Sequence, residues 1–131
     1  DFLDYNAAIP KLSKTTVKVN TRSLTDAVER TSLLISDRLR SPIRLAVTEQ
    51  TVQLNCSTTM GKAHDEVECE MTGEPVSMGF NNKYLLDALK ASDCDKIKME
   101  INGALSPMRV MPLEGESFLF LVLPVRVKND D

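Results

Sequence analysis

Length, composition and charge limit the classes to which this chain can belong. It has 131 residues, of which 42% are hydrophobic and 27% are charged, as in one soluble globular domain. No apolar run reaches the roughly 20 residues that span a bilayer and no signal peptide opens the sequence, so we expect a cytoplasmic protein with no membrane partner. The formal net charge of −3 argues against a protein that grips nucleic acid through a strongly basic surface.

Few residues could carry catalysis or bind a metal. Cys56, Cys69 and Cys94 are odd in number and lack a C-x-x-C spacing, which argues against a disulfide framework and against a zinc site. The single histidine, His64, lies close in sequence to two of these cysteines. However, no glycine-rich segment could build an oxyanion site or cradle a phosphate. We therefore expect no catalytic residue, no metal and no cofactor.

The first 14 residues lack the periodicity of a packed element. Phe2, Tyr5 and Ile9 are isolated apolar residues, and Pro10 begins a polar stretch that is typical of a linker. The sequence therefore predicts a tail and linker over residues 1–14, followed by a domain over residues 15–131. A disordered leader is the alternative for the first segment.

A regular pattern begins at Thr15. β-branched residues predict a strand over Thr15–Val19. Asn20, Thr21 or Ser23 can cap the helix that follows, whose apolar spacing continues through Ile35. Alternating apolar and polar residues then predict three half-buried strands, at residues 43–48, 52–56 and 65–71.

The same order of elements then repeats. After the turn at residues 73–75, an apolar strand over Val76–Phe80 leads into a helix that Asn81 or Asn82 can cap. The apolar stripe of this helix consists of Leu85, Leu86 and Leu89. Three more strands are expected at residues 96–101, 107–111 and 117–123. The repeated order of strand, helix and three strands predicts an α+β fold.

The last predicted strand is apolar on both faces. Its two alternating sets are Phe118, Phe120 and Val122 against Leu119, Leu121 and Leu123. Such a strand is either covered on both sides or borders a partner. Leu121 and Leu123 are therefore either core residues or part of a contact surface.

Several sequence motifs, in order, carry a family resemblance. The run F-N-x-K-Y-L-L-D-A-L-K-A is followed by L-S-P and then by a terminal L-P-V-R. This series resembles the third domain of the bacterial DNA polymerase III beta subunit, the sliding clamp. The opening residues Phe2, Asp4, Tyr5, Ile9 and Pro10 resemble the segment that closes the middle domain of that family. The resemblance thus covers nearly the whole chain and assigns residues 1–14 to the tail of a middle domain plus a linker.

The resemblance implies a DNA clamp fold and a non-catalytic role. Two strand–helix–three-strand units would pack with pseudo-two-fold symmetry, with helices on one side and antiparallel sheets on the other. A homodimeric ring of the full-length protein would encircle duplex DNA without reading its sequence and would give the polymerase processivity. The helices line the hole in this family, so the DNA-facing candidates are Arg22, Arg30, Lys83 and Lys90. Simple solvation of each cation is the alternative.

The resemblance also implies a cleft between the middle and third domains. There, short peptides rich in leucine and phenylalanine would dock, from the DNA polymerase III alpha subunit, the clamp loader, and repair proteins with other clamp-motif peptides. The corresponding residues are Leu3, Ala7, Ala8, Leu105, Ser106, Pro107, Leu121, Leu123, Pro124, Val125 and Arg126. Leu3 stands where the family usually has proline, and Ala7 and Ala8 are smaller than the usual arginine and valine.

The resemblance implies a third surface, where the first domain of a neighbouring subunit would bind. Its candidates are Leu33 and Leu34 at the end of the first helix, and Glu66 and Glu68 on the acidic strand. Two alternatives to the ring remain open from the sequence. One is a stand-alone peptide-binding or scaffold domain of the same fold, and the other is an unrelated small α+β enzyme.

Overall fold

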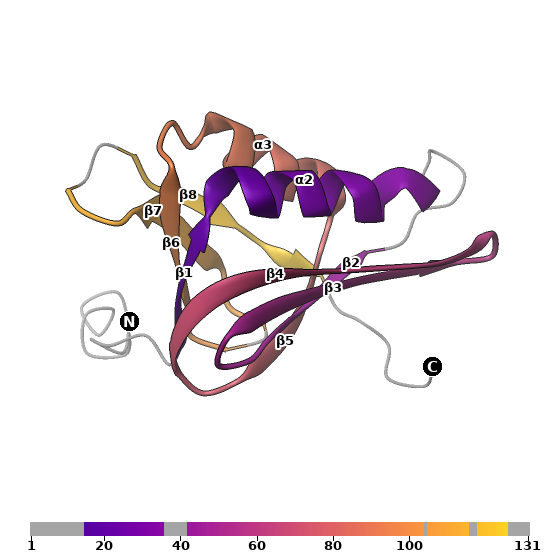
Figure 1. The fold of residues 1–131 in the computed structure, drawn as a ribbon, viewed down its shortest axis with the longest axis horizontal. Coiled ribbons are helices and arrows are strands. Elements are labelled where there is room, and N and C mark those ends of the chain that lie inside the picture. Colours follow the sequence, from indigo (N-terminus) through magenta and orange to yellow (C-terminus); the bar gives the residue numbers. More distant parts are fainter. Residues whose placement is uncertain (1–14, 36–41, 104, 116–117, 126–131) are drawn as a thin grey trace, which may run out of the picture.

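A computed structural model describes residues 15–35, 42–103, 105–115 and 118–125, and shows the same order of elements twice (Figure 1). The first unit contains β1 (Thr15–Asn20), α2 (Thr21–Thr31), the short 3-10 helix η2 (Ser32–Leu34), β2 (Ile43–Val47), β3 (Thr51–Thr58) and β4 (Gly61–Gly73). The second contains β5 (Val76–Phe80), α3 (Asn82–Ala91), β6 (Lys96–Ile101), β7 (Met108–Pro112), β8 (Phe120–Val122) and β9 (Pro124–Val125). The predicted α+β repeat is confirmed.

The strands are amphipathic, as predicted. In β2 and β3 the buried residues are the alternate ones, namely Ile43, Leu45, Val47, Val52, Leu54 and Cys56. Successive side chains of a strand point to opposite faces, so one face of each strand enters the core. β4 is longer than predicted, because it pairs with β3 along its first part and with β1 along its last.

The strands of the described residues pair antiparallel in the order β8-β7-β6-β1-β4-β3-β2-β5-β9. β4 joins the two parts of this sheet, since Gly61–Glu68 pairs with β3 and Cys69–Gly73 pairs with β1. The last strand makes the equivalent connection in two pieces, with β8 on β7 and β9 on β5. In addition, the first strand of each unit pairs with the second strand of the other, β1 with β6 and β5 with β2. These reciprocal pairings express the pseudo-two-fold relation between the units.

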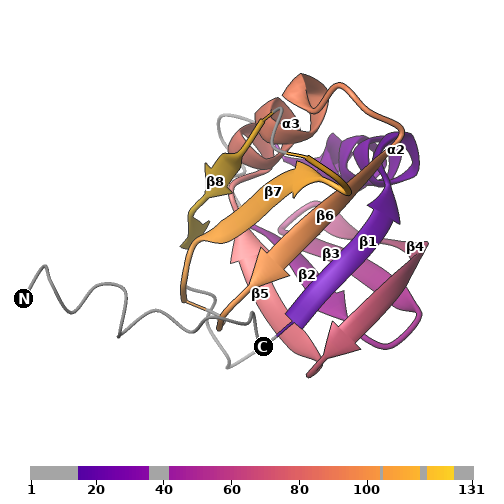
Figure 2. The same cartoon turned by 90° about the vertical axis from the view of Figure 1, so that its left-hand side faces the viewer.

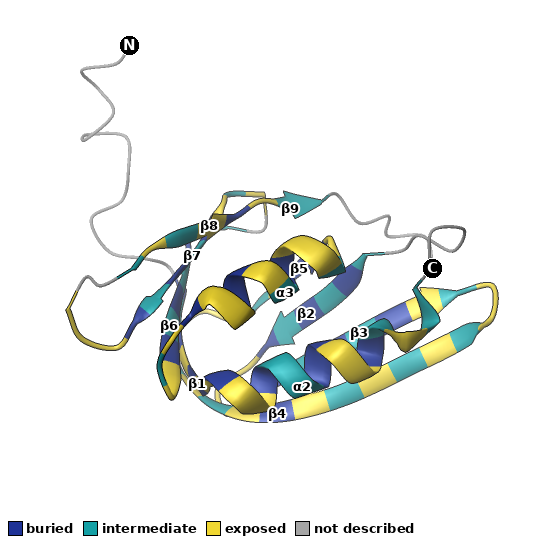
Figure 3. Ribbon diagram, turned by 90° about the horizontal axis from the view of Figure 1, so that it is seen from above, coloured by how far each residue is buried: buried dark blue, intermediate teal, exposed yellow. Residues whose placement is uncertain are grey.

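Both helices lie side by side on one side of the sheet (Figure 3). They are linked at the surface by an ion pair of 3.0 Å between Lys90 Nζ of α3 and Glu29 Oε2 of α2. Their inward faces carry Leu24, Ala27 and Val28 on α2 and Leu85, Ala88 and Leu89 on α3, all buried. Leu86, also predicted on the apolar stripe, is half-buried.

Asparagine caps begin both helices, and hydroxyl side chains bond to carbonyl oxygens at the end of the first. Asn20 Oδ1 accepts from Ser23 N at 2.8 Å, and Asn81 Oδ1 accepts from Lys83 N at 2.9 Å. The prediction that the first helix continues to Ile35 is wrong. The hydroxyls of Thr31 and Ser32 donate to carbonyl oxygens four residues back, and the chain tightens into η2. Such hydroxyl bonds compete with regular helix geometry.

The last predicted strand is divided rather than continuous. β8 ends at Val122, and β9 begins at Pro124 against a different neighbour. Proline has no backbone N–H to donate, so it suits the point where a strand changes partner. The inward residues Phe118 and Phe120 stack with ring centroids 5.3 Å apart.

The three cysteines are free thiols, and Cys56 is buried in the core. Burial raises the pKa of the Cys56 thiol, which keeps it protonated and unreactive near neutral pH. Three methionines, Met78, Met99 and Met108, are buried in the core. Among the described residues, neither helix has the length and apolar character needed to cross a bilayer.

Candidate functional site

The last strand exposes a row of leucines. Leu119, Leu121 and Leu123 are 55%, 61% and 66% exposed, whereas Val122 between them is 2% exposed. These three leucines, here called the leucine patch, lie on one side of the strand because side chains at every second position share a face. Large apolar side chains exposed together are typical of a surface that binds another protein. The alternative that Leu121 and Leu123 are core residues is wrong.

The loop before β7 extends the leucine patch. The β7–β8 pairing ends at Met108 opposite Val122, so the loop of residues 105–107 enters β7 next to the point where β8 ends. Leu105 in this loop is 67% exposed, Pro107 is exposed and Ser106 is half-buried. The end of the L-S-P motif and the start of the L-P-V motif therefore adjoin, since Pro107 and Leu123 each lie next to one of the paired residues Met108 and Val122.

On its other side, the end of the last strand adjoins the start of α3. Pro124 and Val125 are half-buried and pair with Phe80 and Gly79 of β5. Seven of the predicted cleft residues lie in the described part of the chain, with Leu105, Ser106 and Pro107 before β7 and Leu121, Leu123, Pro124 and Val125 along the last strand. The other four, Leu3, Ala7, Ala8 and Arg126, lie outside the described residues.

Two exposed residues near this surface were not among the predicted site residues. Tyr84 is 65% exposed in the first turn of α3, directly after the strand that pairs with β9. The signal in the sequence that could have identified Tyr84 is a large aromatic residue among charged residues on the polar face of the helix. Leu119 follows the same alternation as Leu121 and Leu123, so the period of the strand alone could have identified it.

The outer surface of the two helices has mixed charge. A hollow of about 970 Å³ lies where α2 begins and α3 ends, lined by Arg22 and Lys90 but also by Asp26, Glu29, Asp93 and Asp95. Lys83 is exposed on α3, and Lys90 is paired with Glu29. Three of the four predicted DNA-facing cations are therefore exposed on the helices, and two of them, Arg22 and Lys90, share their hollow with four carboxylates.

The fourth cation, Arg30, is tied to β4. Arg30 Nε donates to Asp65 Oδ2 at 2.7 Å, which joins the end of α2 to the strand beneath it. This hydrogen bond is the main cause that lowers the pKa of the Asp65 carboxyl. It also raises the pKa of Arg30. Arg30 is thus held by a carboxylate while most of its side chain remains exposed.

The residues predicted to contact a neighbouring subunit gather at one edge. Leu33 in η2 is 81% exposed and Leu34 is half-buried, while Glu66 and Glu68 are exposed on β4. Among the described residues, Gly61–Glu68 of β4 pairs only with β3 and leaves its other edge open. An open strand edge can receive another chain, and like charges along it disfavour unspecific pairing.

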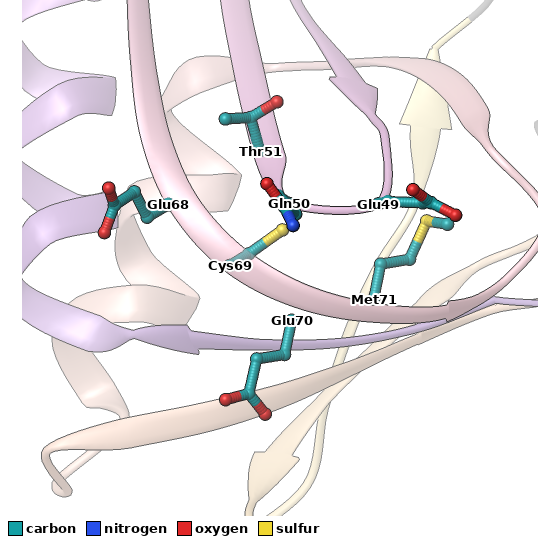
Figure 4. A pocket seen from close by; sticks show the side chains of 7 residues that line it. All are labelled: Glu49, Gln50, Thr51, Glu68, Cys69, Glu70 and Met71. Atoms are coloured by element: carbon teal, nitrogen blue, oxygen red, sulfur yellow. The ribbon is translucent and has the colours of Figure 1, made fainter.

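A second hollow, of about 540 Å³, lies where β4 passes from β3 to β1 (Figure 4). Its rim carries Glu49, Glu68 and Glu70, and the Cys69 side chain lies close to Gln50. Burial raises the pKa of the Cys69 thiol, and so does the charge of Glu70. No group of three ligating side chains suited to a metal ion occurs among the described residues.

The sole histidine is bound to polar neighbours and not to a cysteine. His64 Nδ1 is 2.7 Å from Asn55 Oδ1 across the β3–β4 pair, and His64 Nε2 is 3.6 Å from Glu66 Oε2. The closeness of His64 to Cys56 and Cys69 in sequence therefore does not produce a cysteine–histidine pair among the described residues. The geometry around His64 is that of an exposed hydrogen-bonded side chain on a strand.

Comparison with known proteins agrees with this geometry. The family model described as DNA polymerase III beta subunit, C-terminal domain, matches residues 6–126. The beta sliding clamp of Haemophilus influenzae is 31% identical over 127 residues, which cover 96% of this chain and 34% of that protein. The beta sliding clamp of Bacillus subtilis is 30% identical over 129 residues, with the same coverage. The chain thus spans about a third of the length of these curated relatives.

Solved structures of sliding clamps have the same fold. The DNA polymerase sliding clamp from Bacillus subtilis matches with a TM-score of 0.86 at 29% identity, over 95% of this chain and 34% of that one. A sliding clamp from Bartonella birtlesii bound to griselimycin matches with a TM-score of 0.82 at 29% identity and the same coverage. The sequence match spans both structural units, and the structures share their arrangement. The chain therefore belongs to the family formed by the C-terminal domain of the DNA polymerase III beta subunit.

Proposed function

We propose that this chain is the C-terminal part of a ring-shaped sliding clamp, a non-catalytic processivity factor of DNA replication. In this proposal the complete protein is a cytoplasmic homodimeric ring, in which residues 1–14 continue from a middle domain. The ring stays on duplex DNA because it encloses the duplex. A weak, sequence-independent contact through the exposed cations of the helices then suffices.

The proposed docking site is the leucine patch together with residues 105–107 and 124–126. The observation that carries this proposal is the exposure of Leu121 and Leu123 at positions where the family resemblance places its peptide cleft. Apolar side chains of a bound peptide would remove these leucines from water, the usual source of affinity at such sites. The partners proposed are peptide segments of the polymerase III alpha subunit, the clamp loader and repair proteins.

The neighbouring subunit is proposed to bind at Leu33, Leu34, Glu66 and Glu68. Leu33 offers an apolar anchor, and the two carboxylates face outward from the open edge of β4. A partner with basic residues would complement this edge and an apolar pocket would receive the leucine. This surface would close the ring head to tail.

Retention on circular duplex DNA tests the ring directly. The product of the complete gene, loaded onto nicked circular duplex, is expected to remain bound in 0.5 M salt and to be lost once the circle is cut. Salt screens phosphate contacts but cannot open a closed linkage. Equal loss from circular and linear duplex in high salt would overturn the ring.

Titration with a short peptide containing leucine and phenylalanine tests the docking site. The peptide is expected to bind the intact protein with a Kd in the micromolar range, and Leu121→Ala with Leu123→Ala should weaken binding by about tenfold or more. Leu113→Ala, at a less exposed leucine outside the patch, is the matched control and should leave the Kd unchanged. Identical titration curves for the double variant and the control would refute the site.

A further inference from the structure

Strands β8, β7, β6 and β1 lie side by side and form one half of the sheet (Figure 2). The face of this half that is turned away from the core adjoins the leucine patch, because Leu121 of β8 is exposed on it. The outward residues of these strands follow from the alternation that buries their neighbours. Three cations on adjacent strands lie on this face, here called the basic sheet face: Lys18, Lys98 and Arg109. None of the proposed DNA-facing, docking and subunit surfaces includes these residues.

Arg109 joins the basic sheet face to the leucine patch. In the β7–β8 register Arg109 lies directly opposite Leu121, and outward side chains of opposed residues are neighbours. Arg109 is 42% exposed by side chain, and its Nη1 lies 3.7 Å from Glu100 Oε1. An arginine has five N–H donors in a planar fork, so the Glu100 contact leaves donors available for a second carboxylate.

The carboxylates on this face do not balance its cations. Lys98 Nζ lies 3.7 Å from Glu100 Oε2, so Glu100 is shared between Lys98 and Arg109. In the neighbouring row Lys18 stands opposite Glu70 on one side and opposite Lys98 on the other. Like charges opposed across strands repel. An additional carboxylate placed over this face would relieve that repulsion.

From this arrangement we infer that the docking site extends onto the basic sheet face and selects peptides with acidic residues beside their apolar anchors. The inference rests on the proposed docking function and specifies the chemistry of its partner. The apolar residues of the peptide cover the leucine patch, and an adjacent aspartate or glutamate accepts hydrogen bonds from Arg109. Lys98 and Lys18 attract the remaining negative charge.

The same face is poorly suited to a nucleic acid. Glu70 and Glu100 lie among the cations and would repel a continuous chain of phosphates. The adjoining leucines offer a nucleic-acid backbone nothing to bind. A single peptide carboxylate needs one guanidinium and an apolar neighbour, which is the pairing that Arg109 and Leu121 provide.

Two pairs of labelled peptides test the inference on the intact protein. All four share one leucine- and phenylalanine-containing core, and carry either three aspartates or three asparagines at the amino end or at the carboxyl end. One aspartate peptide is expected to bind about two- to fivefold more tightly than its asparagine partner at low salt, the range for exposed ion pairs. Arg109→Gln should abolish that preference, whereas Lys62→Gln, at an exposed lysine on the distant β3–β4 hairpin, should preserve it.

The outcomes separate this inference from the proposed function. If the aspartate and asparagine peptides of each pair bind equally well, the acidic selection is overturned and the docking site stands. The same holds if Arg109→Gln weakens the binding of the aspartate peptide and of its asparagine partner to the same extent. Binding of the peptides that is unaffected by Leu121→Ala, or absent altogether, overturns the docking site and the inference together. Competition by a short duplex DNA that Arg109→Gln relieves would reassign the face to nucleic acid. Circular dichroism of each variant checks that the fold is retained.

Discussion

β4 and the last strand occupy equivalent places in the two units and have opposite surfaces. Each connects the two parts of the sheet, β4 without interruption and the last strand as β8 and β9. β4 turns a row of glutamates outward, whereas the last strand turns leucines outward. Each strand buries a valine near the point where it passes from one part of the sheet to the other, Val67 at 7% exposure and Val122 at 2%. The fold therefore depends on the inward residues, and the outward residues are free to specialise.

This difference explains how one repeated unit can supply two kinds of contact. A long charged strand with an open edge suits a partner of opposite charge, since charge fixes register and deters wrong pairing. A short strand with exposed leucines suits an apolar peptide, whose affinity comes from buried area. Variants of the inward and outward residues should therefore separate stability from binding.

The largest effect is expected from Phe80→Ala. Phe80 has no exposed surface and lies in β5 between Ile43 of β2 and Pro124 of β9. Truncation leaves a cavity where the last strand passes from β7 to β5, and it should lower the free energy of unfolding by about 3–5 kcal/mol. Urea denaturation followed by circular dichroism measures this loss. A decrease below about 1 kcal/mol would show that β5 and β9 are not packed as described.

The two buried valines allow the anchoring of β4 to be compared with that of the last strand. Val67→Ala and Val122→Ala each remove two methyl groups from a buried site, and each should lower the free energy of unfolding by about 1.5–2.5 kcal/mol. Similar losses in urea denaturation would show that the short, divided strand is anchored as firmly as β4. A loss at Val122 that is negligible beside the loss at Val67 would break the equivalence.

Much of this fold could be predicted from local pattern, and less of its surfaces. Alternation in the strands and the stripes of the helices gave the repeat and nearly the whole core. The end of α2 was missed because the apolar period continues to Ile35, whereas the chain tightens into η2 after Thr31, where the hydroxyls of Thr31 and Ser32 bond to carbonyl oxygens of the preceding turn. The division of the last strand was missed because it depends on which distant strand pairs with Pro124.

The leucine patch shows why surface roles are harder to predict. A strand that is apolar on both faces fits a buried strand as well as a docking surface, and only the layout of the sheet decides between them. Arg30 gives a second example, because its partner Asp65 lies 35 residues away in sequence. The cleft residues were predicted from the family resemblance. Tyr84 lies outside the apolar stripe of α3, and its position near the docking site follows only from the pairing of β5 with β9.

The helix caps test whether the two units also begin their helices equivalently. Asn20 and Asn81 each accept hydrogen bonds from free N–H groups in the first turn, at 2.8 Å for Asn20 and at 2.9 and 3.3 Å for Asn81. Replacing either by alanine should lower the free energy of unfolding by about 1 kcal/mol. The corresponding serine variants retain an acceptor and should recover most of the loss. An unchanged urea midpoint in both alanine variants would contradict the caps.

The smallest effect is expected at the ion pair that fastens α2 to β4. Because Arg30 donates to Asp65, the pKa of this carboxyl in the folded chain lies below its ordinary value of 3.8. A carboxyl with a lowered folded pKa stabilises the fold at pH values above 3.8, and that contribution is lost as the pH falls through the folded pKa. Asp65→Asn should therefore be less stable than the native chain at pH 7, and the difference should shrink toward pH 2–3.

Two further measurements identify the ion pair as the cause. Arg30→Gln removes the other partner and should show the same convergence with the native chain in acid. Because Arg30 is largely exposed to solvent and Asp65 is partly exposed, 0.5 M salt at pH 7 should also reduce the difference. Asp65 Oδ1 additionally accepts from Glu66 N at 2.8 Å, and asparagine can retain that bond, so the substitution removes mainly the charge. A stability difference that stays constant from pH 7 to pH 3 would assign it to packing, and β4 would then be held to α2 without a contribution from charge.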